Sequence, residues 1–199
     1  MQLLGPDFYA NDTVHVARQL LGTYIVSLHK EIVTSGMIVE TEAYGDHHDA
    51  ASHAARGCTA RTQSMFGAVG HAYVYFIYGN HYCLNVVARA PWCAAGAVLI
   101  RAIEPIEGIE VIKERRGQAA SAKALYTLTN GPGKLAQALG ITRHYDGSNI
   151  MHPHQLYIIA GQIIPDEQVL ATPRIGISKA QELLWRFTVH RNPYVSRCR

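Results

Sequence analysis

Apolar residues near the N-terminus recur at helical spacing. Residues 11–13 read Asn-Asp-Thr, which are typical helix-capping side chains, and the apolar residues that follow share one face: Val14, Ala17, Leu20 and Leu21. Gly22 is a typical stop signal. We therefore predict a helix from about Thr13 to Gly22 that packs on the core.

Further along the chain, several short segments are rich in β-branched and aromatic residues, which favour strands. A turn over residues 30–36 joins the first two segments, and Gly79-Asn80 makes a β-hairpin of the third and fourth, although Gly-Asn is a weaker turn signal than Asn-Gly. The predicted strands are residues 23–29, 37–44, 73–78, 81–87, 97–103, 156–160 and 186–190.

Two later segments predict helices. A helix opens at Glu104-Pro105, because acidic residues come early in it and basic residues late, and a shorter one follows NGPGK at residues 130–134. The apolar residues of segment 45–70 follow neither the spacing of a helix nor the alternation of a strand. Long irregular stretches often carry function. With no repeat, no linker-like stretch and no βαβ alternation, the chain predicts an α+β fold: a single domain over residues 1–199 with a largely antiparallel sheet.

The charge of the chain leaves its partner open. Eighteen Lys and Arg against 15 Asp and Glu give a net charge of +3, an excess too small to prove a nucleic-acid partner. Basic residues gather near the C-terminus, either as phosphate contacts or as a solubilising face: Arg174, Lys179, Arg186, Arg191, Arg197 and Arg199.

The cysteines and the N-terminus indicate where the protein resides. The four cysteines form no CxxC pair, and a chain of this size needs no disulfides, so a reducing, intracellular setting fits best. No signal peptide or membrane span is evident, and we expect a soluble, untargeted protein.

Two carboxylates, Glu40 and Glu42, lie near the end of a predicted strand. Because they are two residues apart, both point to the same face. A partly buried glutamate beside an aromatic residue can act as a general base. A structural glutamate, on the surface or buried, is the alternative.

Tyrosines are concentrated in one segment, with four in the ten residues from 73 to 82. Aromatic faces stack nucleobases, so this cluster suits a pocket for a flat ring. Taken alone, core packing is the better explanation of tyrosine-rich strands.

A histidine-rich segment offers a rival chemistry. His47, His48, His53 and Cys58 resemble a metal-ligand set, and a metal-dependent hydrolase that uses the three histidines stays open as an alternative. Their spacings match neither HExxH nor the zinc deaminase pattern, so we expect no metal.

Several longer motifs, taken in order, resemble the alkyladenine, or 3-methylpurine, DNA glycosylase family of base-excision repair. They are IVETEAY at 38–44, YVYFIYG at 73–79 with HYCLNVV at 81–87, VLIRAIEP at 98–105 and NGPGKL at 130–135. The resemblance spans nearly the whole chain. It implies a compact domain whose curved antiparallel sheet is surrounded by helices and carries a protruding β-hairpin.

The resemblance also implies roles for particular residues. Glu42 corresponds to the general base that activates a water, and Arg101 to the arginine that helps to place it. The aromatic walls that hold the flipped base correspond to Tyr44, His53 and Tyr75, with His48 as a competing candidate for His53. Asn85 corresponds to the residue that obstructs normal purines, and Tyr78 to the side chain that enters the duplex.

The resemblance thus implies a monofunctional glycosylase that removes alkylated, etheno or deaminated purines from double-stranded DNA without metal or cofactor. Water is the expected nucleophile, because no lysine falls in the matched catalytic motifs. We expect a monomer, cytoplasmic and nucleoid-associated if bacterial or nuclear if eukaryotic. A non-catalytic binder of lesioned or distorted DNA is the alternative.

Overall fold

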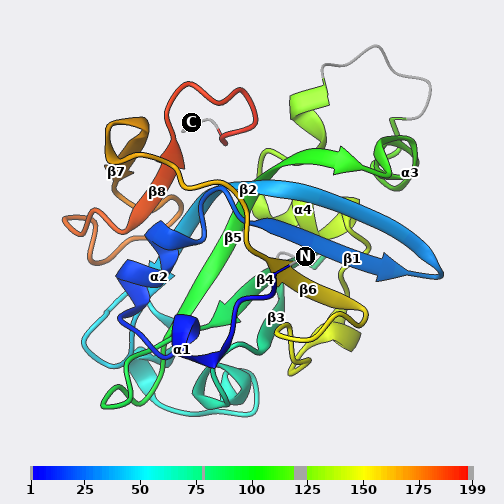
Figure 1. The fold of residues 1–199 in the computed structure, drawn as a ribbon. Coiled ribbons are helices and arrows are strands. Elements are labelled where there is room, and N and C mark those ends of the chain that lie inside the picture. The colour runs from blue at the N-terminus through cyan, green and yellow to red at the C-terminus, as the bar shows by residue number, and fades with distance from the viewer. Residues whose placement is uncertain (1, 78, 119–124, 197–199) are drawn as a thin grey trace.

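The strands described here form one antiparallel sheet (Figure 1). The computed structural model describes residues 2–77, 79–118 and 125–196. In these ranges the strand order is β3-β4-β5-β2-β1-β6, while β8 pairs with both β2 and β7. The strands are β1 (Tyr24–His29), β2 (Ile32–Tyr44), β3 (Ala72–Ile77), β4 (His81–Val87), β5 (Ala97–Glu107), β6 (Leu156–Ile159), β7 (Val169–Thr172) and β8 (Arg186–Val189).

Short helices surround this sheet. The α-helices of the described ranges are α1 (Pro6–Tyr9), α2 (Thr13–Gln19), α3 (Ile109–Arg115) and α4 (Pro132–Ala138). The 3₁₀ helices are η1 (His53–Arg56), η2 (Gln63–Phe66), η3 (Leu125–Leu128), η4 (Arg143–Tyr145) and η5 (Asp166–Gln168). None of the helices described here is long and apolar enough to span a membrane.

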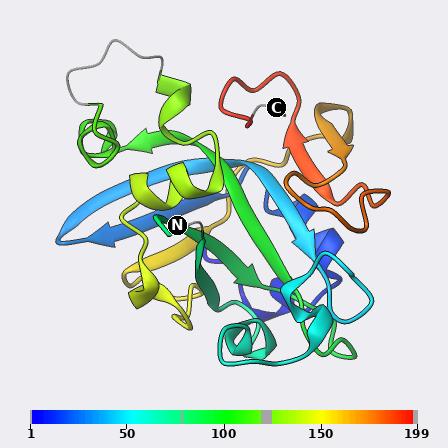
Figure 2. The same cartoon turned by 180° about the vertical axis from the view of Figure 1, so that it is seen from behind.

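Helices α2 and α4 cover opposite faces of the sheet, as the two views of Figures 1 and 2 show. The Asp12 side chain caps α2 by accepting from the His15 amide at 2.9 Å, as the sequence predicts. On β2, the Thr41 hydroxyl donates to the carbonyl of Ala17 in α2. Because side chains alternate along a strand, Glu40 and Glu42 lie on the other face.

The predicted α+β fold with a largely antiparallel sheet is confirmed, and β2 gives it curvature. Its pairing with β5 shifts register after Ser35, Ile38 and Glu40, and such bulges bend and twist a strand. Figure 1 shows the β1–β2 hairpin reaching away from the rest of the sheet.

The turn between the first two strands is shorter than the sequence predicts. The turn expected over residues 30–36 is only Lys30 and Glu31, and β2 begins at Ile32. Both turn residues have positive φ, of 52° and 64°. Lys and Glu seldom adopt this conformation, so the sequence gives no signal for a tight turn at these two positions. The sequence also missed α1 and β7.

The helix expected to open at Glu104-Pro105 starts later. Strand β5 continues to Glu107, and Pro105 pairs with Gly36 of β2. Proline is tolerated there because β4 pairs with β5 only over Ala97 to Leu99, which leaves one side of this part of β5 without a strand partner in the described ranges. Gly108, at φ 72°, then turns the chain into α3.

Candidate active site

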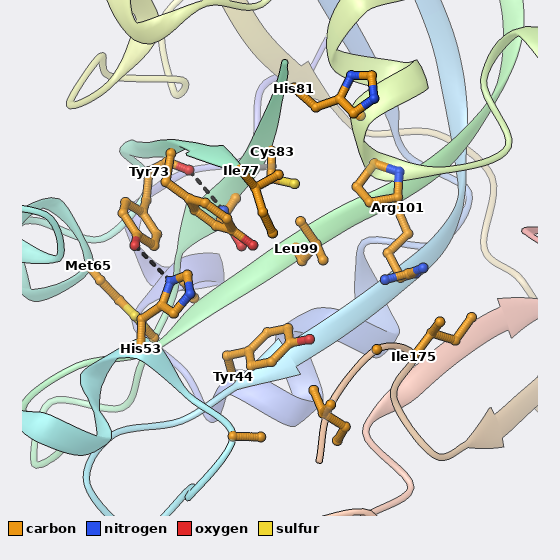
Figure 3. Close-up of a pocket in the computed structure, with 18 residues that line it drawn as sticks. Tyr44, His53, Met65, Tyr73, Ile77, His81, Cys83, Leu99, Arg101 and Ile175 are labelled. Atoms are coloured by element: carbon orange, nitrogen blue, oxygen red, sulfur yellow. Dashed lines mark hydrogen bonds between the residues drawn. The ribbon is translucent and has the colours of Figure 1, made fainter. Parts of the chain in front are cut away.

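A cavity of about 340 Å³ opens where strands β2 to β5 meet segment 175–177 and the start of α4. Figure 3 shows Tyr44, His53, Tyr73 and Arg101 around it. Its volume is at the lower end of the range of small-molecule pockets, about 300–1,000 Å³. The other lining residues are Ala51, Met65, Tyr75, Ile77, His81, Cys83, Asn85, Ala97, Leu99, Pro132, Gly133, Ile175, Gly176 and Ile177.

One side of the cavity is an aromatic cluster from β3 and η1. The ring centroids of His53 and Tyr75 are 4.6 Å apart in an edge-on arrangement, and those of Tyr73 and Tyr75 are 5.4 Å apart. The Nδ1 atom of His53 lies 3.0 Å from the Tyr73 hydroxyl (Figure 3). These contacts fix the orientation of the rings before any ligand arrives.

The cluster is uncharged near neutral pH. Burial raises the pKa of Tyr75 well above its usual range and that of Tyr73 to about 12. Burial, and then the positive charge of Arg61, lower the pKa of His53. A neutral imidazole does not repel a cationic ring in the cavity.

Glu42 lies behind the cavity wall. Its carboxylate is buried and accepts three hydrogen bonds: from the Tyr44 hydroxyl at 2.8 Å, from Arg101 at 3.1 Å and from the Ile175 amide at 2.7 Å. Glu42 does not itself line the cavity, but all three of its donors do. The carboxylate thus adjoins the cavity through its three donors and has no exposed surface of its own.

A β-bulge directs Arg101 toward both glutamates. Glu40 pairs with Ala102 and Thr41 with Ile100, so Arg101 has no partner opposite it on β2. Its Nε donates to Glu40 at 3.1 Å and its Nη1 to Glu42 at 3.1 Å. Burial disfavours its charge, but the two carboxylates outweigh that effect and raise its pKa.

Glu40 holds the C-terminal segment as well as Arg101. Its carboxylate accepts from Arg186 at 2.7 Å, and from both the amide and the hydroxyl of Ser196 at 2.7 Å. The sequence grouped Glu40 with Glu42 but gave no sign of this network, because its donors lie up to 156 residues away.

Asn85 and Tyr78 belong to the β3–β4 hairpin. Asn85 is buried, lines the cavity and donates from Nδ2 to the Tyr73 carbonyl at 3.0 Å. Tyr78 lies outside the described residues, so its insertion into DNA stays a prediction.

The histidines of the irregular segment do not act as one set. His53 lines the cavity, whereas His48 is exposed and does not. Among the described residues, one group has ligand atoms close enough together to hold a metal ion: Asp46, His47 and His48, within 4.8 Å of one another. His53, which the metal hypothesis requires, is not part of it.

The basic residues near the C-terminus do not form one surface. Arg174 and Arg186 are buried in ion pairs with Asp49 and Glu40, so the idea that they contact phosphate is wrong for these two. Lys179 and Arg191 are exposed, and Arg197 and Arg199 lie outside the described residues.

Sequence reasoning missed two contributors to the site. Ile175 acts through its backbone amide, which leaves no mark in the amino-acid pattern. Cys83 lines the cavity beside Tyr75, and burial raises the pKa of its thiol. In the sequence, Cys83 belongs to an apolar strand pattern, which predicts packing and gives no sign that the residue lines a cavity.

Comparisons with known proteins identify the family. The methylpurine-DNA glycosylase family matches residues 7–193. Two relatives that bear the name "Putative 3-methyladenine DNA glycosylase" come from Carboxydothermus hydrogenoformans and Bacillus thuringiensis. The first is 46% identical over 98% of this chain and 99% of its own length. The second is 45% identical over 96% and 98%.

A third relative of the same name, from Chlorobaculum parvum, is 45% identical over the whole of this chain and 93% of its own length. Matches of this extent cover the cavity, both glutamates and the bulge of β5. The chain therefore belongs to the methylpurine-DNA glycosylase family and is, by that membership, an enzyme of the DNA glycosylase class.

Proposed function

We propose that this protein is a monofunctional glycosylase that flips damaged purines out of duplex DNA and hydrolyses the bond to the sugar, leaving an abasic site. One observation carries the proposal. The carboxylate of Glu42 is buried and accepts three hydrogen bonds from the described residues, all from donors that line the cavity, and its Oε1 accepts only one of them. A carboxylate oxygen offers about two lone-pair positions, so the proposed water enters between these donors and takes the second position on Oε1.

In this mechanism Glu42 takes a proton from the water, and the water oxygen attacks the sugar carbon C1′. The glycosidic bond breaks as the new bond forms, and its electron pair leaves with the purine. An N-alkylated purine already carries a positive charge, so it leaves as a neutral base. Arg101 and the Ile175 amide hold the Glu42 carboxylate in place.

Water is the proposed nucleophile because no lysine is among the cavity-lining residues in the described part of the chain. A glycosylase that cleaves through a Schiff base needs such an amine. Glu42 supplies the activating base instead, so the purine is released and the sugar stays in the DNA strand as a plain abasic site.

The proposed base-binding walls are Tyr44 on one side and His53 and Tyr75 on the other. Stacking on aromatic side chains contributes about 1–3 kcal/mol per base and offsets the few kcal/mol that unstacking costs. The electron-rich tyrosine faces also attract a cationic purine. Etheno and deaminated purines would bind by stacking alone.

Asn85 is proposed to exclude guanine. Its amide nitrogen is held by the Tyr73 carbonyl at 3.0 Å, so the side chain cannot turn aside for the exocyclic amino group of guanine. Tyr78 is proposed to fill the gap that the flipped nucleotide leaves, as inserted side chains do in other distorted duplexes.

DNA is the partner that the family implies. We propose double-stranded DNA with damaged purines as the substrate and a monomer as the active form. The bacterial origin of the relatives supports a cytoplasmic, nucleoid-associated location.

The test is the release of free base from duplex oligonucleotides that carry hypoxanthine, ethenoadenine or a methylated purine, with chelator present. Glu42→Gln is compared with Glu107→Gln, which changes an exposed glutamate at the end of β5. We expect release by the parent and by the Glu107 variant, and none by the Glu42 variant.

Other outcomes would favour other functions. Tight lesion binding without free base from the parent would favour the non-catalytic binder. Loss of release on adding chelator would favour the metal-dependent hydrolase. Release by Glu42→Gln at the parent rate would remove Glu42 from the mechanism.

A further inference from the structure

Arg174 and Asp49 form a buried ion pair beside the cavity. Arg174 donates from Nη1 to Asp49 Oδ2 at 2.5 Å and from Nη2 to Oδ1 at 2.7 Å, so the contact is bidentate. Both side chains are 1% exposed or less. A pair of this kind fixes direction as well as distance.

Each partner also holds the backbone of a segment that lines the cavity. Asp49 accepts from the amides of Gly45 and Ala51, at 3.0 and 3.1 Å, and so shapes the loop that leads to His53. Arg174 precedes Ile175, whose amide donates to Glu42. The pair therefore ties the His53 loop to the Ile175 segment, although the two are 125 residues apart.

Tyr44 lies between these two segments. The Arg174 guanidinium is 4.7 Å from the centre of the Tyr44 ring and donates to the Ala43 carbonyl at 2.8 Å. It also lies over the ring of Trp185, at 5.1 Å. Arg174 thus contacts Tyr44, whose hydroxyl donates to Glu42. It also holds Ala43, the residue before Tyr44 at the end of β2.

We infer that the Asp49–Arg174 pair is a positioning device for the glycosylase reaction, which holds Tyr44 and the Ile175 amide on the Glu42 carboxylate. The inference rests on the proposed function. Buried ion pairs add little net stability, since apolar residues of similar volume often do as well. What apolar residues cannot supply is the direction of the contact, and misplacement of about 1 Å at a catalytic group can cost 100-fold in rate.

The experiment measures single-turnover base release and lesion-duplex affinity for Asp49→Asn, Arg174→Gln and the double variant. We expect each single variant to release base about 10- to 100-fold more slowly, with affinity changed less than about threefold, because phosphate contacts elsewhere supply most of the affinity. Asp166→Asn is the matched control, since it removes the exposed ion pair of Arg18. It should behave as the parent does.

The double variant separates positioning from stability. It leaves no unpaired charge, so its melting temperature should recover toward that of the parent, while base release stays slow. Recovery of the rate together with stability would overturn the inference, as would single variants that react at the parent rate.

Arg174→Lys covers the case in which the other variants do not fold. It keeps the charge beside Asp49 but cannot make the bidentate contact, so we expect a folded protein with slow base release. A parent rate in this variant would contradict the positioning role. No release by the parent itself would overturn the proposed function, and this inference with it.

Discussion

Glu40 and Glu42 lie two residues apart on one strand and face the same way, yet their surroundings differ. Both carboxylates are buried and share Arg101. Glu40 accepts four hydrogen bonds, from Arg101, from Arg186 and twice from Ser196. Glu42 accepts three, and every one of its donors lines the cavity.

The difference separates a structural carboxylate from one that can do chemistry. Each carboxylate has one oxygen that accepts a single hydrogen bond from the described residues, Oε2 in Glu40 and Oε1 in Glu42. The difference lies in where the donors are, because Arg186 and Ser196 are not among the cavity-lining residues, whereas all three donors of Glu42 are. The donors of Glu40 come from the C-terminal part of the chain, so this residue joins the sheet to that segment. Identity and spacing alone do not distinguish the two, because the donors that occupy them come from elsewhere in the fold.

The largest expected effect is the loss of base release in Glu42→Gln. Without a carboxylate to accept the proton of water, single-turnover release should fall by about 10²- to 10⁴-fold, the usual contribution of general base catalysis. Lesion-duplex affinity, measured by fluorescence anisotropy, should stay near that of the parent. A matching fall in affinity would indicate a binding role for Glu42 instead.

Glu40→Gln should act mainly on stability. It leaves Arg101 and Arg186 buried beside a neutral amide, and breaking a buried pair from one side costs about 3–5 kcal/mol in the free energy of unfolding. Urea denaturation followed by circular dichroism measures this loss. The comparison would be reversed if Glu40→Gln stayed as stable as the parent and released no base.

The sequence predicted most elements of the fold because their signals are local. The Asp12 cap predicts α2, and the tyrosine-rich hairpin predicts β3 and β4. The errors arise where tertiary pairing decides. Lys30 and Glu31 adopt positive φ to let β2 pair with β1. Pro105 stays in a strand because, among the described strands, β2 alone pairs with that part of β5.

The site was less predictable from the residues themselves. A resemblance to a family supplied the names of Glu42, Tyr44 and Arg101, but not the bulge that aims Arg101 or the amide of Ile175. Both depend on register and on contacts across more than 50 residues of chain. Such contacts have no period or motif in the sequence.

Arg101→Lys sharpens the comparison, because within the described ranges this arginine is the donor that both carboxylates share. Lysine keeps the charge but cannot bridge Glu40 and Glu42 with two separate donors in a fixed fork. Loss of one charged hydrogen bond, about 1.5–3 kcal/mol, corresponds to roughly 10- to 100-fold in base release. Single-turnover assays check this, and a variant as fast as the parent would show that the shared contact has no role in the reaction.

The smallest effect is expected from Ser196→Ala, which removes one of the four donors of Glu40 and leaves the backbone amide of residue 196 in place. The loss of one hydrogen bond should lower the free energy of unfolding by about 1 kcal/mol. The variant weakens the contacts of Glu40 without touching those of Glu42, so base release should not change. If release did change, the contacts of Glu40 would have to matter to the reaction itself, and the separation between a structural and a chemical carboxylate would fail.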